Sequence, residues 1–351
     1  MTDPSPASGL AAADTNLPER VAVVGAGVIG SAWVARWALC GVDVAVADPS
    51  PAASRHVEST LDAARTAWRR LGLLPSDSAA APHTEGTVTV VAPEAGYAEA
   101  ADGAELICEC VPERLALKRT VYAEIEDAAT SDAVIASSTS GIRPSDLQAE
   151  MRHPERLVVG HPFNPVYLLP LVEVAAGAHT SERTVAQVTG WFAAAGMSPL
   201  RVRTEVDGFI ADRLMEALWR EALWLVHDGV ATVSEIDDAM RLGFGLRWAQ
   251  MGVFQTYATA GGEGGFRHFI EHFGPALQLP WTKLTDVPEM SPEFMATLIA
   301  QSDEQSAGQS AAELCAARDR NLVDVLLALE ANDWGAGRSL ASLRERLAGR
   351  S

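Results

Sequence analysis

The sequence predicts an α/β fold with a doubly wound sheet, followed by an all-helical carboxy-terminal domain. A β-branched run at residues 21–24 leads into a glycine-rich segment at 25–30, and a helical pattern follows directly. Strand-like and helical stretches then alternate as far as about residue 203, which is typical of a mostly parallel sheet covered by helices. Beyond about residue 205, apolar residues recur at helical spacing without strand patterns between them.

The elements are predicted one by one from these patterns. Apolar runs predict strands at residues 21–24, 42–47, 87–91, 104–111, 133–136, 156–159, 171–174 and 201–203. Helical spacing predicts helices at 31–38, 52–71, 114–129 and 182–195, then at 208–228, 234–242, 292–305 and 311–329. Ser234 and Asp237 are expected to cap the helix at 234–242. We expect a disordered lead at 1–18, a nucleotide-binding domain at 19–204, a helical domain at 205–335 and a tail at 336–351.

The glycine-rich segment has the GxGxxG spacing between a strand and a helix, as in a Rossmann-type dinucleotide site. The first glycine permits a tight turn, the second lets a pyrophosphate approach the backbone, and the third lets helix and strand pack closely. The pyrophosphate is expected at the positive end of the helix. The residues expected to bind it are Gly25, Gly27, Val28, Ile29 and Gly30. The alternative is a sharp strand-to-helix turn that binds no ligand.

Asp48 follows the second predicted strand, where an acidic residue binds the hydroxyls of the adenosine ribose. A carboxylate at this position repels a 2′-phosphate, so it favours NAD over NADP. Arg55 is the nearest cation that argues otherwise, and we interpret it as a surface charge on the next helix.

His161 and Glu173 are the candidate catalytic pair. His161 lies in a proline-braced segment just after an apolar strand, and Glu173 lies within the apolar run Leu-Val-Glu-Val. A carboxylate in such a strand is costly to bury without a partner, and His161 is the obvious one. A histidine held by a carboxylate has a fixed tautomer and is suited to general-base catalysis. The alternative is that His161 caps a turn and Glu173 faces water.

Composition limits the classes of function. The 351 residues suffice for about two domains, and no charge-free run approaches the ~20 residues needed to span a bilayer. The lead has neither the cationic start nor the apolar core of a signal peptide. A net charge of −19 argues against nucleic acid and anionic membranes as partners, and favours cationic small molecules. The four cysteines show no metal-like pairing, and Cys108 and Cys110 are expected to be buried, reduced thiols, so we expect a cytoplasmic protein without a metal.

The motifs together resemble the 3-hydroxyacyl-CoA dehydrogenase superfamily over residues 19–331. The residues that carry the resemblance are, in order, the 25–30 glycines, Asp48, Glu113, Ser140, His161, Asn164 and Glu173. The resemblance implies an NAD-dependent oxidoreductase in which a Rossmann domain is coupled to a helical, dimer-forming domain. It implies that His161 and Glu173 form the base for hydride transfer, assisted by Ser140 and Asn164. It also implies that Glu113 and Lys118 belong to the NAD site.

One position departs from the superfamily pattern. Asp212 stands in the segment Asp-Gly-Phe-Ile-Ala-Asp-Arg where the superfamily normally has an asparagine that contacts the substrate. An aspartate offers no N–H to a thioester carbonyl and adds negative charge beside an acyl group. Asp212 therefore weakens the expectation of a CoA thioester substrate.

The second domain resembles one branch of the superfamily, the L-carnitine dehydrogenases, in residues 243–252, 257–265 and 280–283. This resemblance implies oxidation of L-carnitine, a small zwitterion, to 3-dehydrocarnitine. A trimethylammonium group is bound by aromatic faces and nearby carboxylates. The candidates for that role are the aromatic residues Trp248, Phe254 and Tyr257, with the negative charge supplied by Asp212 or Glu216. The alternative is that the aromatic residues are packing contacts. Arg247 is the candidate for the substrate carboxylate, because a guanidinium matches it with two parallel hydrogen bonds.

Three alternatives stay open. The first is a 3-hydroxyacyl-CoA dehydrogenase, and the second is a dehydrogenase for a small hydroxy acid such as L-gulonate. The third is a crystallin-like structural protein that binds the cofactor without turnover. In each case we expect a homodimer formed through the helical domain, with Trp219 and Leu223 as core or dimer contacts.

Overall fold

The structure is a computed structural model that describes residues 17–70, 74, 85–249, 251–279, 291–306, 308–310, 313, 324–325 and 327–333. These residues form two compact units, one up to Met215 and one from Glu216 onward. The predicted domain boundary at 204/205 stays a prediction. Almost all of the predicted lead at 1–18, the predicted tail at 336–351 and most of the predicted helix at 311–329 lie outside the described residues.

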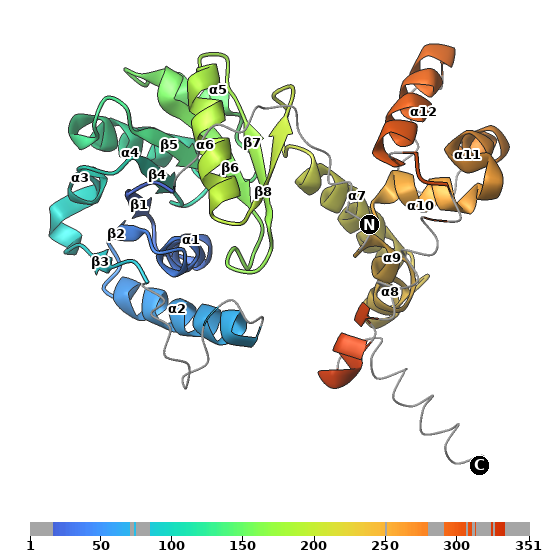
Figure 1. The fold of residues 1–351 in the computed structure, drawn as a ribbon, viewed down its shortest axis with the longest axis horizontal. Helices are drawn as coiled ribbons and strands as arrows, with labels where there is room; N and C mark the ends of the chain where they lie inside the picture. Colours follow the sequence, from blue (N-terminus) through green and yellow to red (C-terminus); the bar gives the residue numbers. More distant parts are fainter. Residues whose placement is uncertain are drawn as a thin grey trace. The chain divides into compact units, whose positions relative to one another are not determined.

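The first unit contains one sheet, which has eight strands within the described residues (Figure 1). Their order across the sheet is β3 (Val88–Val90), β2 (Asp43–Ala47), β1 (Arg20–Val24), β4 (Leu106–Glu109), β5 (Val134–Ser137), β6 (Leu157–Pro162), β7 (Leu171–Ala175) and β8 (Ser198–Val202). Neighbouring strands are parallel except β6 and β7, which are antiparallel. The predicted fold class is confirmed, and each predicted strand is present with ends shifted by a few residues.

Helices cover both faces of this sheet. They are α1 (Val28–Leu39), α2 (Ala53–Arg70), α3 (Gly96–Ala101), α4 (Leu115–Ala128), α5 (Pro144–Gln148) and α6 (Glu182–Ala194). One hydrophobic cluster joins α1, α2 and α6 to the sheet, and a second joins α3, α4 and α5 to it. Successive strand residues alternate between the clusters, since Val21 and Val23 belong to the first and Ala22 and Val24 to the second. The short helices α3 and α5 were not predicted.

The second unit is helical. Helix α7 (Ala211–His227) begins in the first unit and ends in the second. It is followed by α8 (Val233–Ala239), a π-helical turn (Met240–Phe244), α9 (Gly245–Trp248), α10 (Val253–Ala260), α11 (Gly265–Phe273) and α12 (Pro292–Ser306). Ala258, Phe266, Ile270 and Ile299 form its small core within the described residues.

The predicted cap of α8 was wrong. Thr232, in extended backbone, is the N-cap, and its hydroxyl accepts a hydrogen bond from the Glu235 amide while the Glu235 carboxylate accepts from the Thr232 amide. The N-cap therefore lies two residues before Ser234, which lies inside the first turn of the helix. The Thr232 hydroxyl and the Glu235 carboxylate already bind amides at the helix start, a role that was expected of Ser234 and Asp237. None of the described helices is both long and apolar enough to cross a membrane.

Candidate active site

The turn between β1 and α1 leaves a helix N-terminus open. Gly25 has φ of +96°, in the left-handed region that favours glycine, and a Cβ on Gly30 would lie 1.7 Å from the Gly25 carbonyl oxygen. A Cβ on Gly27 would meet nothing within 4 Å. The first and third glycines are therefore required by the fold, while the second leaves space in front of the α1 amides, where a phosphate binds well.

Asp48 ties the end of β2 to this turn. Its carboxylate accepts hydrogen bonds from the Ala26 amide at 2.6 Å and from the Ser50 amide at 2.7 Å. Beside it lies a pocket of about 130 Å³, which is lined mainly by apolar groups: Ala47, Asp48, Pro49, Val91, Ala92, Pro93, Gly96 and Tyr97. The residues present fit a dinucleotide, with open amides for a pyrophosphate, a carboxylate for a ribose diol and an apolar pocket for a flat base.

His161 and Glu173 face each other across the antiparallel pair β6 and β7. The two residues are register partners, and the His161 Nδ1 lies 3.0 Å from the Glu173 Oε2. Both side chains are buried, with relative exposures of 6% and 0%. The structure therefore brings the two residues together, as the sequence predicted.

Glu173 also holds the start of α7. Its Oε1 accepts hydrogen bonds from the Ile210 and Ala211 amides, each at 3.0 Å. Burial acts to raise the pKa of Glu173, but the hydrogen bonds from His161 and from these two amides outweigh it and hold the pKa below its usual range. An ionised Glu173 accepts a hydrogen bond from the Nδ1–H of His161, so the Nε2 of His161 carries the free lone pair.

Asp212 lies on the other side of the imidazole. Its Oδ2 is 3.7 Å from the His161 Nε2, and its side chain is one quarter exposed. The rings of Phe163 and Phe209 pack against the imidazole, with centroid distances of 4.8 and 5.7 Å. His161 therefore lies between two carboxylates, that of Glu173 near Nδ1 and that of Asp212 near Nε2.

The turn that follows β6 is held by α1. The buried Arg36 donates two hydrogen bonds to the Val166 carbonyl, at 3.1 Å from Nε and 2.9 Å from Nη2. Asn164 lies in this turn, is exposed and precedes a cis peptide bond to Pro165. Arg36 thus fixes the chain just beyond His161.

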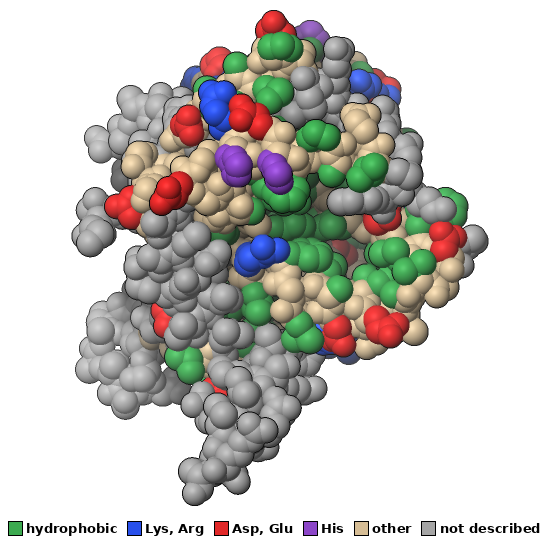
Figure 2. Space-filling model, turned by 90° about the vertical axis from the view of Figure 1, so that its right-hand side faces the viewer, with side chains coloured by type: hydrophobic (Ala, Val, Ile, Leu, Met, Phe, Trp, Pro, Cys, Tyr) green, Lys and Arg blue, Asp and Glu red, His purple; other side chains and the backbone are tan. Residues whose placement is uncertain are grey.

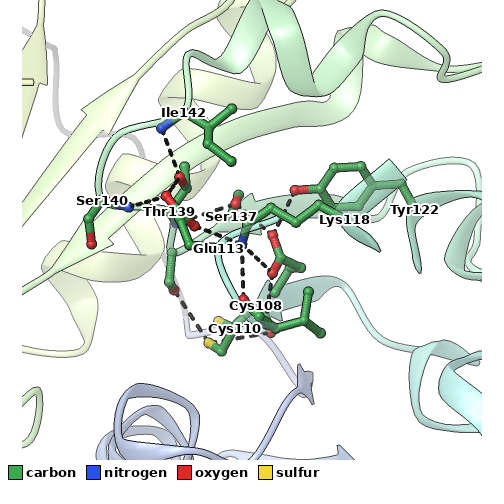
Figure 3. A network of polar contacts seen from close by, with 12 residues as sticks. Cys108, Cys110, Glu113, Lys118, Tyr122, Ser137, Thr139, Ser140 and Ile142 are labelled. Carbon is green, nitrogen blue, oxygen red and sulfur yellow. Dashed lines mark hydrogen bonds and ion pairs between the residues drawn. The ribbon is translucent and has the colours of Figure 1, made fainter. Parts of the chain in front are cut away.

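Ser140 lies on the exposed turn after β5, and Glu113 fixes this turn (Figure 3). The Glu113 Oε1 accepts hydrogen bonds from the Thr139 hydroxyl and from the amides of Ser140 at 3.2 Å and Gly141 at 3.3 Å. Burial acts to raise the pKa of Glu113, but the Thr139 hydroxyl and the charge of Lys118 hold it below its usual range. Within the described part of the chain, neither Ser140 nor Asn164 hydrogen-bonds to His161 through its side chain.

Sequence reasoning missed Glu109, the centre of a fully buried polar network beneath this turn. Its carboxylate accepts hydrogen bonds from Lys118 Nζ at 2.8 Å, the Tyr122 hydroxyl at 2.7 Å and the Ser137 hydroxyl at 2.6 Å. Lys118 also lies 3.4 Å from Glu113, so its ammonium joins the network to the Ser140 turn (Figure 3). Lys118 is only 1% exposed and is bound by protein groups, so its expected contact with the cofactor stays a proposal.

The candidate substrate residues of the second unit lie on α9 and α10. Arg247 is exposed and Trp248 half-buried, with its ring 4.5 Å from that of Phe244. The exposed Tyr257 stacks on Phe269, and Phe254 is also exposed. Their roles toward a substrate stay predictions, and the segment 280–283 lies outside the described residues.

The described residues hold no candidate metal cluster, and the thiols of Cys108 and Cys110 are not activated. No group of three or more His, Cys, Asp or Glu side chains among them is arranged to hold a metal ion. Burial raises the pKa of Cys108 well above its usual range and that of Cys110 to about 12. Both thiols therefore stay protonated and weakly nucleophilic.

The doubly wound sheet and the open glycine turn define a Rossmann-type dinucleotide-binding domain. Residues 20–206 match the 3-hydroxyacyl-CoA dehydrogenase NAD binding domain, and residues 208–287 match the 3-hydroxyacyl-CoA dehydrogenase C-terminal domain. The chain belongs to the 3-hydroxyacyl-CoA dehydrogenase family. The predicted family resemblance and the predicted NAD-binding domain are thus confirmed.

Among curated relatives, the chain is 50% identical over 325 residues to an L-carnitine dehydrogenase of Mesorhizobium japonicum, covering 91% of this chain and 86% of the relative. It is 47% identical to an L-carnitine dehydrogenase of Pseudomonas putida, covering 91% of this chain and 97% of the relative. An L-carnitine dehydrogenase/betainyl-CoA thioesterase of Agrobacterium fabrum is 49% identical, covering 95% of this chain. The match spans only 66% of that relative's length.

Among solved structures, the fold is similar to an NAD-dependent dismutase, 5-formyl-3-hydroxy-2-methylpyridine 4-carboxylic acid 5-dehydrogenase. The TM-score is 0.67 at 30% identity, covering 89% of this chain and 98% of that one. It is also similar to the (S)-3-hydroxybutyryl-CoA dehydrogenase of Ralstonia eutropha, with a TM-score of 0.55 at 25% identity, covering 72% and 86%.

Proposed function

We propose that the protein oxidises L-carnitine to 3-dehydrocarnitine with NAD. The observation that carries the reaction type is the buried His161–Glu173 pair, whose Nδ1–Oε2 contact leaves Nε2 available as a base. The choice of substrate is supported by relatives of about this chain's length that are named L-carnitine dehydrogenases and are 47–50% identical. The thioesterase named in longer relatives is not part of the proposal.

The proton step follows from the geometry of His161. Glu173 keeps the proton on Nδ1, so Nε2 accepts the proton of the substrate hydroxyl. The imidazolium that forms lies between Glu173 and Asp212, and both carboxylates stabilise its charge. The chemistry that bound NAD supplies is acceptance of the hydride from the carbinol carbon, which leaves the ketone.

The remaining candidate residues have binding roles in this proposal. Gly27 and Asp48 hold the dinucleotide, and Glu113 positions the turn from which Ser140 hydrogen-bonds the reacting oxygen. Asn164 helps to place the nicotinamide ring or the substrate. Arg247, Trp248, Phe254 and Tyr257 are proposed to bind the carboxylate and the ammonium group. We further propose that the protein is cytoplasmic, since Cys40, Cys108 and Cys110 are free thiols, as is usual in reducing compartments. We also propose that it is a homodimer formed through the helical domain.

Following NADH absorbance across a panel of substrates tests the proposal. The panel holds L-carnitine, D-carnitine, L-gulonate, 3-hydroxybutyrate and 3-hydroxybutyryl-CoA, each with NAD and with NADP. We expect turnover with L-carnitine and NAD, lowered by ~10²–10⁴-fold in His161→Ala because general-base catalysis is lost. If only 3-hydroxybutyryl-CoA were turned over, L-carnitine would not be the substrate. Absence of NADH with every alcohol would favour a cofactor-binding structural protein.

A further inference from the structure

We infer that Asp212 selects the substrate by charge and orients it, so that the site takes alcohols with a quaternary ammonium on the carbon next to the carbinol carbon. The inference rests on the proposed oxidation of L-carnitine and deepens it. It gives the ammonium group a place in the first unit, beside the base itself.

The position of the substrate hydroxyl follows from the base. The hydroxyl oxygen must lie ~2.6–3.2 Å from the His161 Nε2 to pass its proton. The Asp212 Oδ2 lies 3.7 Å from the same nitrogen atom. The Asp212 carboxylate therefore borders the space in which the carbinol group binds.

The chemistry of L-carnitine then brings the ammonium group close to Asp212. In L-carnitine the ammonium nitrogen and the hydroxyl are on adjacent carbons, and the substrate carboxylate is on the far side of the carbinol. Bond lengths near ~1.5 Å and staggered torsions put the ammonium nitrogen about 3–4 Å from the hydroxyl oxygen. A rotamer that turns the ammonium toward Asp212 gives a separation on the order of 5 Å between the opposite charges.

The fold fixes Asp212 for this role. It lies in the first turn of α7, next to the Ile210 and Ala211 amides that bind the Glu173 Oε1. The carboxylate that orients His161 on one side thus also anchors the helix that carries Asp212 on the other. Because the Asp212 side chain is only 25% exposed, its field is screened less than that of a surface carboxylate.

A charge pair about 5 Å apart changes binding by roughly 4-fold in water-like surroundings and roughly 250-fold at an effective dielectric constant of about 20. Asp212 also faces the imidazolium, so its loss affects proton transfer for every substrate. The ratio of kcat/KM between a substrate with the ammonium group and one without it removes this common effect. It isolates recognition of the ammonium group.

The test compares L-carnitine with its carbon isostere, racemic 3-hydroxy-5,5-dimethylhexanoate, in which a tert-butyl group replaces the trimethylammonium group while the carboxylate is kept. The variants are Asp212→Asn and a matched control, Asp207→Asn. Asp207 lies five residues earlier, is 80% exposed and pairs with Arg143 at 3.6 Å. We expect Asp212→Asn to lower the ratio of kcat/KM for L-carnitine over the isostere by ~10-fold or more, and Asp207→Asn to leave it unchanged.

A second measurement does not depend on catalytic turnover. γ-Butyrobetaine has the ammonium and carboxylate groups of L-carnitine but no hydroxyl, and its inhibition constant reports binding alone. We expect Asp212→Asn to weaken its inhibition by a similar factor, with the affinity for NADH unchanged.

The outcomes separate the two proposals. L-Carnitine turnover by the wild type with an unchanged ratio in Asp212→Asn would overturn the inference and leave the proposed function intact, because Asp212 would then act on His161 alone. Absence of L-carnitine turnover in the wild type would overturn the proposed function, and the inference with it.

Discussion

At the scale of single residues, the chemistry of His161 is set by the residue directly opposite in the sheet. The antiparallel register of β6 and β7 puts Glu173 across from His161, and neither side chain has to leave its strand to meet the other. Forming the contact costs little further conformational entropy, since burial already confines both side chains. The pair is thus preorganised before any substrate binds.

Glu173→Gln should separate the charge of Glu173 from its shape. The amide keeps the volume but no longer fixes the Nδ1 proton or stabilises the imidazolium, so we expect kcat to fall by ~10²-fold or more. Steady-state kinetics with saturating NAD measures this fall. A variant that retained wild-type kcat would remove Glu173 from the mechanism.

The same variant should change how stability depends on pH. The pKa of Glu173 is lowered in the folded protein, so the unfolded state binds the proton more readily. Its stabilisation is therefore complete above the unfolded pKa of ~4.3 and is lost as pH falls through the lower folded pKa. We expect the wild type to exceed Glu173→Gln in unfolding free energy at pH 6–7, and the difference to shrink below pH ~4. Urea unfolding at several pH values checks this, and a difference that does not vary with pH would contradict it.

At the scale of elements, the glycines of the turn between β1 and α1 have different roles. Gly30→Ala places a Cβ 1.7 Å from the Gly25 carbonyl oxygen, so we expect loss of the folded protein or a large fall in melting temperature. Gly27→Ala meets no neighbouring atom within 4 Å, so the protein should fold normally, but the methyl group occupies the approach to the α1 amides. NAD should bind ~10-fold or more weakly to Gly27→Ala because phosphate approach needs the bare backbone. Calorimetric titration of NAD with thermal unfolding distinguishes the two, and unchanged NAD affinity in Gly27→Ala would place the pyrophosphate elsewhere.

The buried polar network around Glu109, beneath the Ser140 turn, pairs a buried carboxylate with Lys118. Lys118→Met leaves the fully buried Glu109 without its counter-charge, so we expect a loss of ~3–5 kcal/mol in unfolding free energy. The double variant Glu109→Gln with Lys118→Met should recover part of this loss, because no unpaired charge remains. Arg201→Met is the control, since its ion pair with Glu182 is largely exposed, at 42% and 78% of the two side chains. Urea unfolding measures all three, and equal losses in the control and Lys118→Met would contradict the prediction.

How far the sequence predicts these elements depends on how local their causes are. The strands and long helices follow from apolar periodicity, and those that lie within the described residues are observed with shifted ends. Glu109 was missed although it stands in an apolar strand, as Glu173 does, and a carboxylate in such a strand is costly to bury without a partner. Its partners Tyr122 and Ser137 come from α4 and β5, and only the three-dimensional fold identifies them.

At the scale of the whole molecule, the two units differ in how well they bury their apolar residues. The first unit has large clusters on both faces of its sheet. The core of the second unit is small within the described residues, and Trp219 and Leu223 on α7 are 59% and 49% exposed. Hydrophobic side chains are also visible on the surface drawn in Figure 2. Exposed apolar groups of this size mark contact surfaces, which supports the proposal of a homodimer formed through the helical domain.

Trp219→Glu should weaken that dimer. Trp219 and Leu223 are four residues apart, so they lie on the same side of α7 and form one apolar patch. We expect the wild type to sediment at twice the 37.2 kDa of one chain, and Trp219→Glu to shift to the monomer, since loss of a central tryptophan contact costs ~2 kcal/mol or more. Thr66→Glu, which adds the same charge at an exposed site on α2, should remain a dimer. Sedimentation equilibrium at micromolar concentration decides between these states, with circular dichroism showing that both variants are folded. A wild-type monomer, or a Trp219→Glu dimer as tight as the wild type, would place the association surface elsewhere or remove it.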